Sequence, residues 1–321
     1  MLKFVRIQMA KSEEKDRAPR NRTIALASGE ESRLWRKITK ANAARIESRN
    51  IVVCGDSRVA IRSLETNRFD LLFADPPYNL TKQFGVERFK STSADAYEEW
   101  LDSWLQLCVP LMKQTANVYI CGDWRSSAAI QRVGSKYFKL QNRITWEREK
   151  GRGAKRNWKN AAEDIWFFTV SDKFTFNLDA VKQRRRVVAP YRENGKPKDW
   201  DESTEGNFRD THPSNLWTDI TVPFWSMPEN TDHPTQKPEK LLAKIILAST
   251  NPGDLILDPF AGSGTTAVVA KKLGRDFVAI ESDENYCLLA AKRLELAEED
   301  RSIQGFSDGV FWERNTPRPR N

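Results

Sequence analysis

The sequence predicts an α/β protein with a doubly wound, mainly parallel sheet and an insertion in its second half. Short apolar runs alternate with helical patterns along most of the 321 residues, which is the order expected of a parallel sheet covered by helices. One of these runs ends in a glycine-rich turn that leads into a helical pattern, at residues 258–266. Between residues 181 and 228 the periodicity fails, and Pro, Gly, Asn, Arg and Trp accumulate there. This irregular part is a candidate recognition insertion, which we place at residues 181–230.

The first 49 residues are expected to be a basic arm followed by a helix. They hold 13 Lys and Arg against 6 Asp and Glu. Residues 11–31 are polar and charged and include Pro19 and Gly29, which predicts a mobile arm. Residues 32–49 have a basic, helix-like pattern, and we expect ordered structure to begin near there.

Short apolar runs in residues 50–180 predict buried strands at residues 51–54, 70–74, 117–121, 143–146 and 164–170. Residues 94–112 carry Tyr97, Trp100 and Trp104 at helical spacing. Such a face is more often part of a core than a binding surface, so we assign these aromatic residues no function.

After the insertion, residues 237–249 predict a helix with Leu241, Leu242, Ile245 and Ile246 facing inward. Two further strands are predicted at residues 255–258 and 277–281, with one helix between them and another at residues 283–299. Residues 301–321 are expected to be a C-terminal tail.

Charge is distributed unevenly along the chain. The formal charge is +8, yet residues 150–198 alone hold 13 Lys and Arg against 5 Asp and Glu. Basic stretches that alternate with neutral or acidic ones suit a protein that holds a polyanion, most commonly nucleic acid. Two solvated charged faces are the alternative interpretation.

Composition also excludes several classes of protein. The four cysteines are scattered, and the two histidines are His212 and His233, so neither a zinc site nor a disulfide framework is expected. No apolar run approaches the roughly 20 residues that span a bilayer, and the first ten residues lack the apolar core of a signal peptide. We therefore expect a cytoplasmic protein without a membrane partner.

The first motif is the segment Asp258-Pro259-Phe260-Ala261-Gly262-Ser263-Gly264-Thr265-Thr266. It runs from a predicted strand through a glycine turn into a helix, and such a turn lets a ligand approach the backbone closely. Glu281 ends the next predicted strand, where an acidic side chain commonly holds ribose hydroxyls in nucleotide-binding α/β folds. An adenosyl ligand fits this pair.

An NAD-dependent dehydrogenase is an alternative, because Gly262, Gly264 and Ala267 also match the pattern G-x-G-x-x-G/A. Only 40 residues follow Glu281, which are too few for the three further strands of a dinucleotide-binding domain. The chain also lacks Gly-Lys-Ser/Thr, which argues against a phosphate-binding loop of the Walker type.

The second motif, Asp75-Pro76-Pro77-Tyr78, follows a predicted buried strand. Prolines that simply end a strand, beside an acidic turn, are the structural alternative. That alternative leaves unexplained a carboxylate and a tyrosine at the carboxyl end of a strand, where open α/β sheets bind ligands.

This second motif suits chemistry at an exocyclic amine. Such an amine is a poor nucleophile until acceptors hold its protons and favour a pyramidal nitrogen, and Asp75 and the Pro76 carbonyl can do so. Proline has a fixed φ and no N–H, so Pro76-Pro77 offers no competing donor. Tyr78 could stack on the base, and stacking worth about 1–3 kcal/mol would offset part of the few kcal/mol needed to unstack a nucleotide. Base flipping is the expected mode of access.

Together the two motifs resemble those of the amino-methyltransferase family of DNA modification enzymes, and the resemblance covers residues 51 to about 297. In that family a D/N/S-P-P-Y/F/W tetrapeptide is catalytic and an F-x-G-x-G segment binds S-adenosylmethionine. The resemblance implies a seven-stranded sheet of the S-adenosylmethionine-dependent methyltransferase type. Residues 50–180 would be its catalytic half, residues 181–230 its target-recognition insertion and residues 231–300 its cofactor-binding half. The tetrapeptide precedes the glycine segment, which is the β order of the family.

The same resemblance implies the residues that bind the cofactor. Asp56 would lie near the cofactor adenine, and His233 and Thr235 would line its methionine end, with Lys237 paired to its carboxylate. The full expected set is Asp56, Ala74, Asp75, His233, Thr235, Lys237, Asp258, Phe260, Gly262, Ser263, Gly264, Thr265 and Glu281. An acid-rich site suits a positive sulfonium, so we expect neither a metal nor a covalent enzyme intermediate.

An Asp at the head of the tetrapeptide favours adenine N6 over cytosine N4, where Ser is commoner. A cytosine N4 enzyme, an RNA methyltransferase and a DNA-binding module with a dead catalytic fold are the alternatives. A closer resemblance, to the RsrI-type branch of type II modification methyltransferases, implies the target GAATTC in double-stranded DNA. It also implies functional pairing with a restriction endonuclease, without a stable complex.

Two basic segments are expected to bind DNA. One follows a predicted strand and holds Arg152, Lys155 and Arg156; the other is Lys182 with Arg184, Arg185 and Arg186. Arginine contacts phosphates as well as guanine edges, so the sequence leaves these roles open. A solvated charge run is the alternative for the second segment, and we assign no role to His212 or Trp217.

Overall fold

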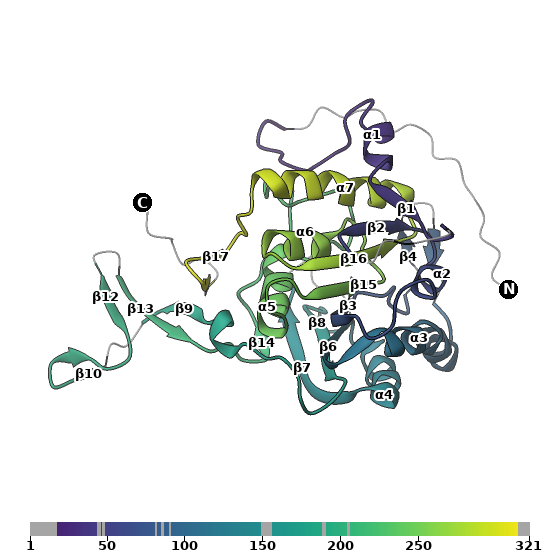
Figure 1. Ribbon diagram of the computed structural model, residues 1–321. Helices are drawn as coiled ribbons and strands as arrows, with labels where there is room; N and C mark the ends of the chain where they lie inside the picture. The colour runs from purple at the N-terminus through teal and green to yellow at the C-terminus, as the bar shows by residue number, and fades with distance from the viewer. Residues whose placement is uncertain are drawn as a thin grey trace.

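The computed structural model describes residues 18–43, 46, 49–80, 82–84, 87–89, 91–148, 156–187, 191–203 and 206–313. Within these residues the main sheet has nine strands in the order β1-β2-β16-β15-β3-β6-β8-β7-β14. Helices cover both of its faces (Figure 1). The expected α/β class with a mainly parallel sheet is confirmed.

The centre of this sheet is parallel. β15 (Leu255–Asp258) lies between β16 (Asp276–Glu281) and β3 (Phe69–Ala74), and β2 (Ile51–Cys54) lies beyond β16. β6 (Met112–Gly122) is parallel to β3. The carboxyl ends of these five strands therefore meet at one edge of the sheet, where ligands bind in open α/β folds.

Two further long strands complete the predicted part of the sheet. β8 (Ala162–Thr169) is antiparallel to β6 and to β7 (Lys139–Glu147). Because β8 runs against β6, its first residues lie at the edge where the five parallel strands end. Residues at the beginning of β8 thereby become neighbours of the tetrapeptide.

Two groups of helices pack on the two faces of the sheet (Figure 1). α2 (Ser57–Ile61), α3 (Ala94–Cys108) and α4 (Ser127–Tyr137) share one buried core. α5 (Glu239–Ser249), α6 (Thr265–Lys272) and α7 (Glu284–Glu299) share the other. The helix predicted at residues 94–112 ends earlier, because a 3₁₀ turn that contains Pro110 follows at Val109–Leu111 and proline has no N–H to continue the helix.

Two short edge strands and the N-terminal segment differ from the prediction. Instead of a long helix after residue 31 there is the short α1 (Glu31–Trp35), followed by β1 (Ile38–Lys40), which pairs with β2. The second edge strand is β14 (Leu216–Trp217), paired with β7. Residues 18–30 are held as well, since Ile24 forms a bridge with Thr231 and Lys292 donates to the carbonyl of Ala25. Strands of two or three residues show no periodicity, so the sequence could not reveal them.

A second sheet, of five strands, projects from the main one (Figure 1). Its order is β12-β13-β9-β18-β17, with the bounds Asp201–Ser203, Gly206–Thr211, Gln183–Arg186, Val310–Trp312 and Phe306–Ser307. Residues 306–312, expected to be tail, thus join the insertion, because Phe311 pairs with Gln183 and is buried. Small hairpins are formed by β10 (Arg192–Glu193) with β11 (Lys196–Pro197) and by β4 (Lys82–Phe84) with β5 (Glu87–Phe89).

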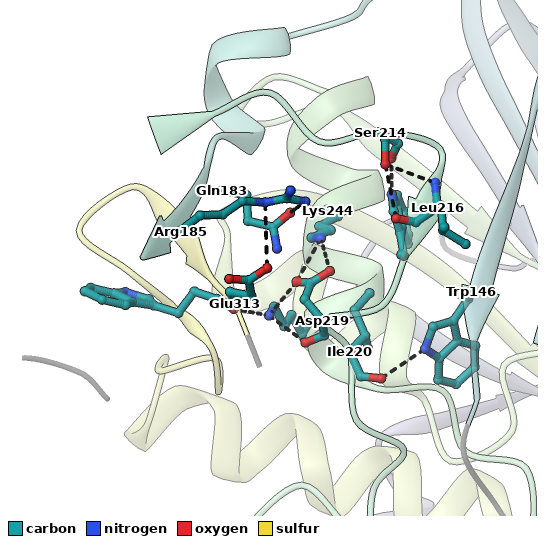
Figure 2. Close-up of polar contacts among 12 residues, drawn as sticks. Trp146, Gln183, Arg185, Ser214, Leu216, Asp219, Ile220, Lys244 and Glu313 are labelled. Atoms are coloured by element: carbon teal, nitrogen blue, oxygen red, sulfur yellow. Dashed lines mark hydrogen bonds and ion pairs between the residues drawn. The ribbon is translucent and has the colours of Figure 1, made fainter. Parts of the chain in front are cut away.

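A buried ionic cluster ties the second sheet to helix α5 (Figure 2). The Asp219 carboxylate accepts hydrogen bonds from Lys244 Nζ at 2.7 and 2.9 Å and lies 2.6 Å from Lys240 Nζ. Lys240 also donates to the carbonyl of Trp312, and Trp146 Nε1 donates to the carbonyl of Ile220 at 3.1 Å. Burial opposes the charge of Asp219, but Lys244 and Lys240 outweigh it and hold the pKa of that carboxyl below its ordinary value.

No helix within the described ranges is both long enough and apolar enough to cross a membrane.

Candidate active site

The tetrapeptide directly follows β3 at the carboxyl edge of the sheet, and hydrogen bonds hold it at both ends. Tyr78 OH donates to Asp75 Oδ1 at 2.9 Å, and Lys237 Nζ donates to Asp75 Oδ2 at 2.5 Å. Tyr97 OH, from α3, donates to the carbonyl of Pro77 at 3.0 Å. The carboxylate is therefore fixed in position before any substrate arrives, which is the preorganisation that an acceptor group needs.

Sequence reasoning missed a second carboxylate in this site. Glu163, at the beginning of β8, is 3% exposed and accepts a hydrogen bond from Tyr78 OH at 3.2 Å. Its Oε2 lies 3.4 Å from Lys237 Nζ, and its Oε1 is paired with Arg148. Burial raises the pKa of Glu163, but the charges of Lys237 and Arg148 outweigh burial and hold that pKa below its ordinary value.

Lys237 occupies the centre of this network. The sequence resemblance places its ammonium on the cofactor carboxylate, whereas here it contacts Asp75 and Glu163 and lies 5.6 Å from the centroid of the Tyr78 ring. Burial lowers the pKa of Lys237, but the two carboxylates raise it above its ordinary value, so the side chain stays charged. The site holds two carboxylates against two cations, which is how buried charges are tolerated.

The hydroxyl of Tyr78 is fixed by the same network. Burial, together with Asp75 and Glu163, raises the pKa of this hydroxyl well above its ordinary value, so it remains a neutral donor. These contacts hold the position of the hydroxyl. The stacking role expected of Tyr78 remains a prediction.

The glycine segment follows β15, the strand next to β3. Asp258 Oδ1 accepts from the backbone N–H of Phe260 at 3.0 Å, and its Oδ2 accepts from Thr266 Oγ1 at 2.5 Å. Gly262 and Gly264 have φ of +53° and +79°, a region that glycine enters freely. A Cβ at Gly264 would lie 2.6 Å from the Cβ of Ala290, and one at Gly262 would lie 2.8 Å from His233 Nε2. Both positions therefore require glycine.

A buried arginine, which sequence reasoning missed, holds the glycine segment by hydrogen bonds. Arg293, on α7, is 2% exposed and donates to the carbonyl of Ser263 at 3.0 Å and to Thr265 Oγ1 at 2.9 Å. Glu239 balances its charge. The Ser263 and Thr265 side chains, expected to bind cofactor, are buried against Arg293, so only their backbone remains for a ligand.

Carboxylates end two further strands at the same edge. Glu281 accepts from the N–H groups of Gly262 and Asp283, both at 2.8 Å, while burial raises its pKa above the ordinary value. Asp56 follows β2 and caps α2, and its other oxygen is paired with Arg58 at 2.6 Å. The N–H of Gly55 donates to the carbonyl of Glu281, which ties the ends of β2 and β16 together. The chain thus brings the candidate ribose and adenine contacts together on neighbouring strands.

The remaining cofactor candidates are placed as follows. The rings of His233 and Tyr286 meet edge to face at 4.4 Å, and the N–H of Thr235 donates to His233 Nδ1 at 3.4 Å. Ala74 ends β3 and is fully buried. The ring of Phe260 packs edge-on against Trp104 at 4.9 Å. Trp104 is therefore a core residue, and Trp100 is partly buried against the same core.

Only some of the DNA-binding candidates lie in described parts of the chain. Arg152 and Lys155 fall outside the described residues, and Arg156 is exposed. Lys182 pairs with Asp179 at 2.9 Å, Arg184 pairs with Asp210 at 2.7 Å, and Arg185 lies 3.9 Å from Glu313. Arg186 is exposed at the end of β9. Three of the four basic side chains in this segment therefore already have an acidic partner on the protein.

Comparison with known proteins identifies the family. The model of the N6/N4 DNA methylase family matches residues 69–292, so the chain belongs to this family. It is 34% identical over 255 residues to the DNA adenine methyltransferase YhdJ of Escherichia coli (strain K12), covering 77% of this chain and 83% of that one. It is also 34% identical over 260 residues to the type II methyltransferase M.HpaI of Haemophilus parainfluenzae, covering 79% and 76%. The expected amino-methyltransferase resemblance is confirmed.

Solved structures agree on the fold. The complex of M1.HpyAVI with S-adenosylmethionine superimposes with a TM-score of 0.52 at 25% identity, covering 76% of this chain and 98% of the other. The cytosine-N4-specific PvuII DNA methyltransferase superimposes with a TM-score of 0.57 at 19% identity, covering 80% and 92%, which shows a shared fold alone. No cluster of three or more His, Cys, Asp or Glu residues in the described part of the chain is arranged to hold a metal ion.

Proposed function

We propose that this chain transfers a methyl group from S-adenosylmethionine to N6 of adenine in double-stranded DNA. The observation that carries the proposal is the fixed carboxylate of Asp75, one strand away from the glycine segment, in a member of the DNA methylase family. Adenine is supported by the relative YhdJ, which is named a DNA adenine methyltransferase.

The residues at the carboxyl edge fit S-adenosylmethionine. Gly262 and Gly264 leave backbone space that a Cβ would fill, and Glu281 and Asp56 end adjacent strands beside it. We assign Glu281 to the ribose, Asp56 to the adenine ring, and His233 and Thr235 to the methionine end. When bound, the cofactor supplies an electrophilic methyl group on a positive sulfonium.

The chain's own residues then act on the target amine. Asp75 and the Pro76 carbonyl accept hydrogen bonds from its two N–H groups and direct the nitrogen lone pair toward the methyl group. Methyl transfer would break the S–C bond and leave its electron pair on sulfur, and the new C–N bond would leave the target nitrogen with one surplus proton, which Asp75 is placed to accept. Lys237 and Arg148 balance the charges of Asp75 and Glu163, which allows two carboxylates to share a mostly buried site.

We also propose a biological role for this chain, in a restriction-modification pair. M.HpaI and M2.DpnII, the latter 31% identical over 274 residues, are named type II methyltransferases, which supports functional pairing with a restriction endonuclease that reads the same site. The target GAATTC rests on the RsrI-type resemblance of the sequence, and the cytoplasm is the compartment in which such a pair meets DNA.

The test is transfer of labelled methyl from S-adenosylmethionine to unmethylated duplex DNA, followed by nucleoside analysis. Label in N6-methyladenine is expected, and duplexes with and without GAATTC separate the target from the activity. Label in N4-methylcytosine would move the reaction to the chemistry named for the PvuII enzyme. Label in RNA alone would overturn the DNA substrate.

A further inference from the structure

A short turn beside the tetrapeptide carries two exposed side chains that the mechanism above does not use. Trp124 is 61% exposed, whereas Trp104 and Trp146 are each 1% exposed. The guanidinium of Arg125 lies 5.1 Å from the centroid of the Trp124 ring. In the part of the chain that the structure describes, no carboxylate lies within salt-bridge distance of Arg125. An arginine over an exposed indole is a surface suited to bases and phosphates.

The turn that carries this pair is rigid. Asp123 Oδ1 accepts hydrogen bonds from the N–H groups of Arg125 and Ser126, at 3.2 and 2.9 Å, and from Ser126 Oγ at 2.5 Å. Asp123 and Ser126 are both buried, and Ser126 immediately precedes α4. The two exposed side chains therefore project from a closed turn, which limits the entropy lost when they bind a partner.

The position of the turn relates it to the target base. β6 pairs with β3 in parallel, with Ile120 opposite Ala74, so Trp124 and Tyr78 each lie four residues beyond this pair in the chain. Tyr97 lies between the two segments, since its hydroxyl donates to the carbonyl of Pro77 at 3.0 Å and lies near Ser126. The exposed pair thus stands next to the catalytic tetrapeptide at the ligand-binding edge of the sheet.

We propose that Trp124 stacks on the base next to the extruded adenine, and that Arg125 contacts a phosphate of the same strand. Extruding a nucleotide leaves its neighbour in the duplex without a stacking partner. An indole held on a rigid turn beside the site replaces that partner and stabilises the extruded state, and the charge of Arg125 complements the backbone. This inference rests on the proposed function, because it needs a duplex substrate.

The test compares a fully paired duplex with one in which the target adenine is mispaired and already loosened. We expect Trp124→Ala to lower kcat/KM about 10- to 100-fold on the paired duplex, the range of one base–aromatic stack, and far less on the mispaired one. Trp124→Phe keeps a ring and is expected to retain most of the activity. With 2-aminopurine at the target, Trp124→Ala should also reduce the fluorescence rise that reports extrusion. Arg125→Gln should reduce the slope of log Kd against log salt by about one.

The matched control is Phe176→Ala. Phe176 is another exposed aromatic residue, but it follows β8 and so lies at the opposite edge of the sheet. The Phe176→Ala substitution is therefore expected to leave these kinetics unchanged. Cofactor affinity and Tm, measured for each variant, report folding. Equal losses on paired and mispaired duplexes, or wild-type kinetics in Trp124→Ala, would overturn the stacking role, and an unchanged salt slope would overturn the phosphate contact. If the wild-type chain methylates no duplex at all, the proposed function fails instead.

Discussion

The carboxyl edge of the main sheet and the second sheet both carry many charges, but they hold them differently. At the edge, Asp75, Glu163 and Lys237 share one buried network. On the second sheet, Arg184 and Asp210 form a partly exposed pair on neighbouring strands. The buried cluster of Asp219, Lys240 and Lys244 is the anchor that joins this sheet to helix α5, through the bond from Lys240 to Trp312. The first region holds its charges in a buried site, and we propose that this site acts on the cofactor and the target base. The second arrangement joins the five-stranded sheet to helix α5.

The largest effect is expected from substitution of Asp75, and this substitution tests whether the charge network at the carboxyl edge is catalytic. Asp75→Ala removes the acceptor for the target amine, so we expect kcat to fall by at least about 10³-fold while cofactor affinity is largely kept. Single-turnover methyl transfer and a cofactor-binding titration measure the two. The control is Asp70→Asn, at the other end of the same strand, where the carboxylate pairs with Lys113. Wild-type turnover in Asp75→Ala would refute the assigned role.

Removing the anchor of the second sheet should mainly affect stability. Asp219→Ala leaves Lys244 buried without a counterion, and breaking a buried pair costs about 3–5 kcal/mol. Urea unfolding monitored by tryptophan fluorescence measures this. Asp210→Ala breaks the partly exposed pair with Arg184 instead, and a loss of at most about 1 kcal/mol is expected. Similar losses of unfolding free energy in the two variants would contradict the difference between the buried cluster and the partly exposed pair.

Two glycine substitutions distinguish the effect of backbone strain from the effect of close packing beside the cofactor site. Gly264→Ala places a Cβ 2.6 Å from that of Ala290, so the turn must move, and we expect cofactor affinity to fall roughly 10- to 100-fold, or about 1.4–2.8 kcal/mol. Gly274 has a similar φ of +73° but nothing within 4 Å of its Cβ position. Gly274→Ala should therefore cost only the backbone strain of about 1–2 kcal/mol and leave cofactor affinity unchanged. Equal affinities in the two variants would show that the close approach is unimportant.

The smallest expected effects are changes in the unfolding free energy with pH, and the contributions of Asp258 and Asp219 should change in opposite directions. Burial raises the pKa of Asp258 to about 7, so the folded state binds a proton that the unfolded state has released. Its contribution to the unfolding free energy is present below about pH 4 and is lost as pH rises toward 7. Lys244 and Lys240 overcome burial and lower the pKa of Asp219, so its contribution is present above about pH 4 and is lost as pH falls below that.

Difference curves test these signs. Unfolding free energies of the ligand-free protein, with wild type compared to Asp258→Asn and to Asp219→Asn, are measured across pH 3–8. The wild-type advantage over Asp258→Asn should shrink as pH rises, and that over Asp219→Asn should shrink in acid. The same sign in both curves would contradict the assignment.

The catalytic and cofactor motifs could be predicted from the sequence because each is contiguous and imposes a local requirement. Asp75 to Tyr78 need consecutive residues after a strand, and Gly262 and Gly264 need a left-handed backbone. The seven long strands were also predictable, because short runs rich in apolar and β-branched residues are visible in the sequence. The short β1 and β14 were not, since two or three residues form no pattern.

The partners of those motifs were decided by tertiary structure alone. Glu163 is 88 positions from Asp75 and Lys237 is 162 positions away, and they meet Asp75 only because β8 runs antiparallel and begins at the carboxyl edge. Arg293 reaches the glycine segment from α7, and Phe311 completes the second sheet from beyond it. By itself, therefore, the sequence determined the class of fold, the methyl-transfer motifs and the family, because those depend on local backbone geometry and periodicity. The charge network and the anchor of the second sheet depend on which distant strands pair, and pairing is settled only when the whole core packs.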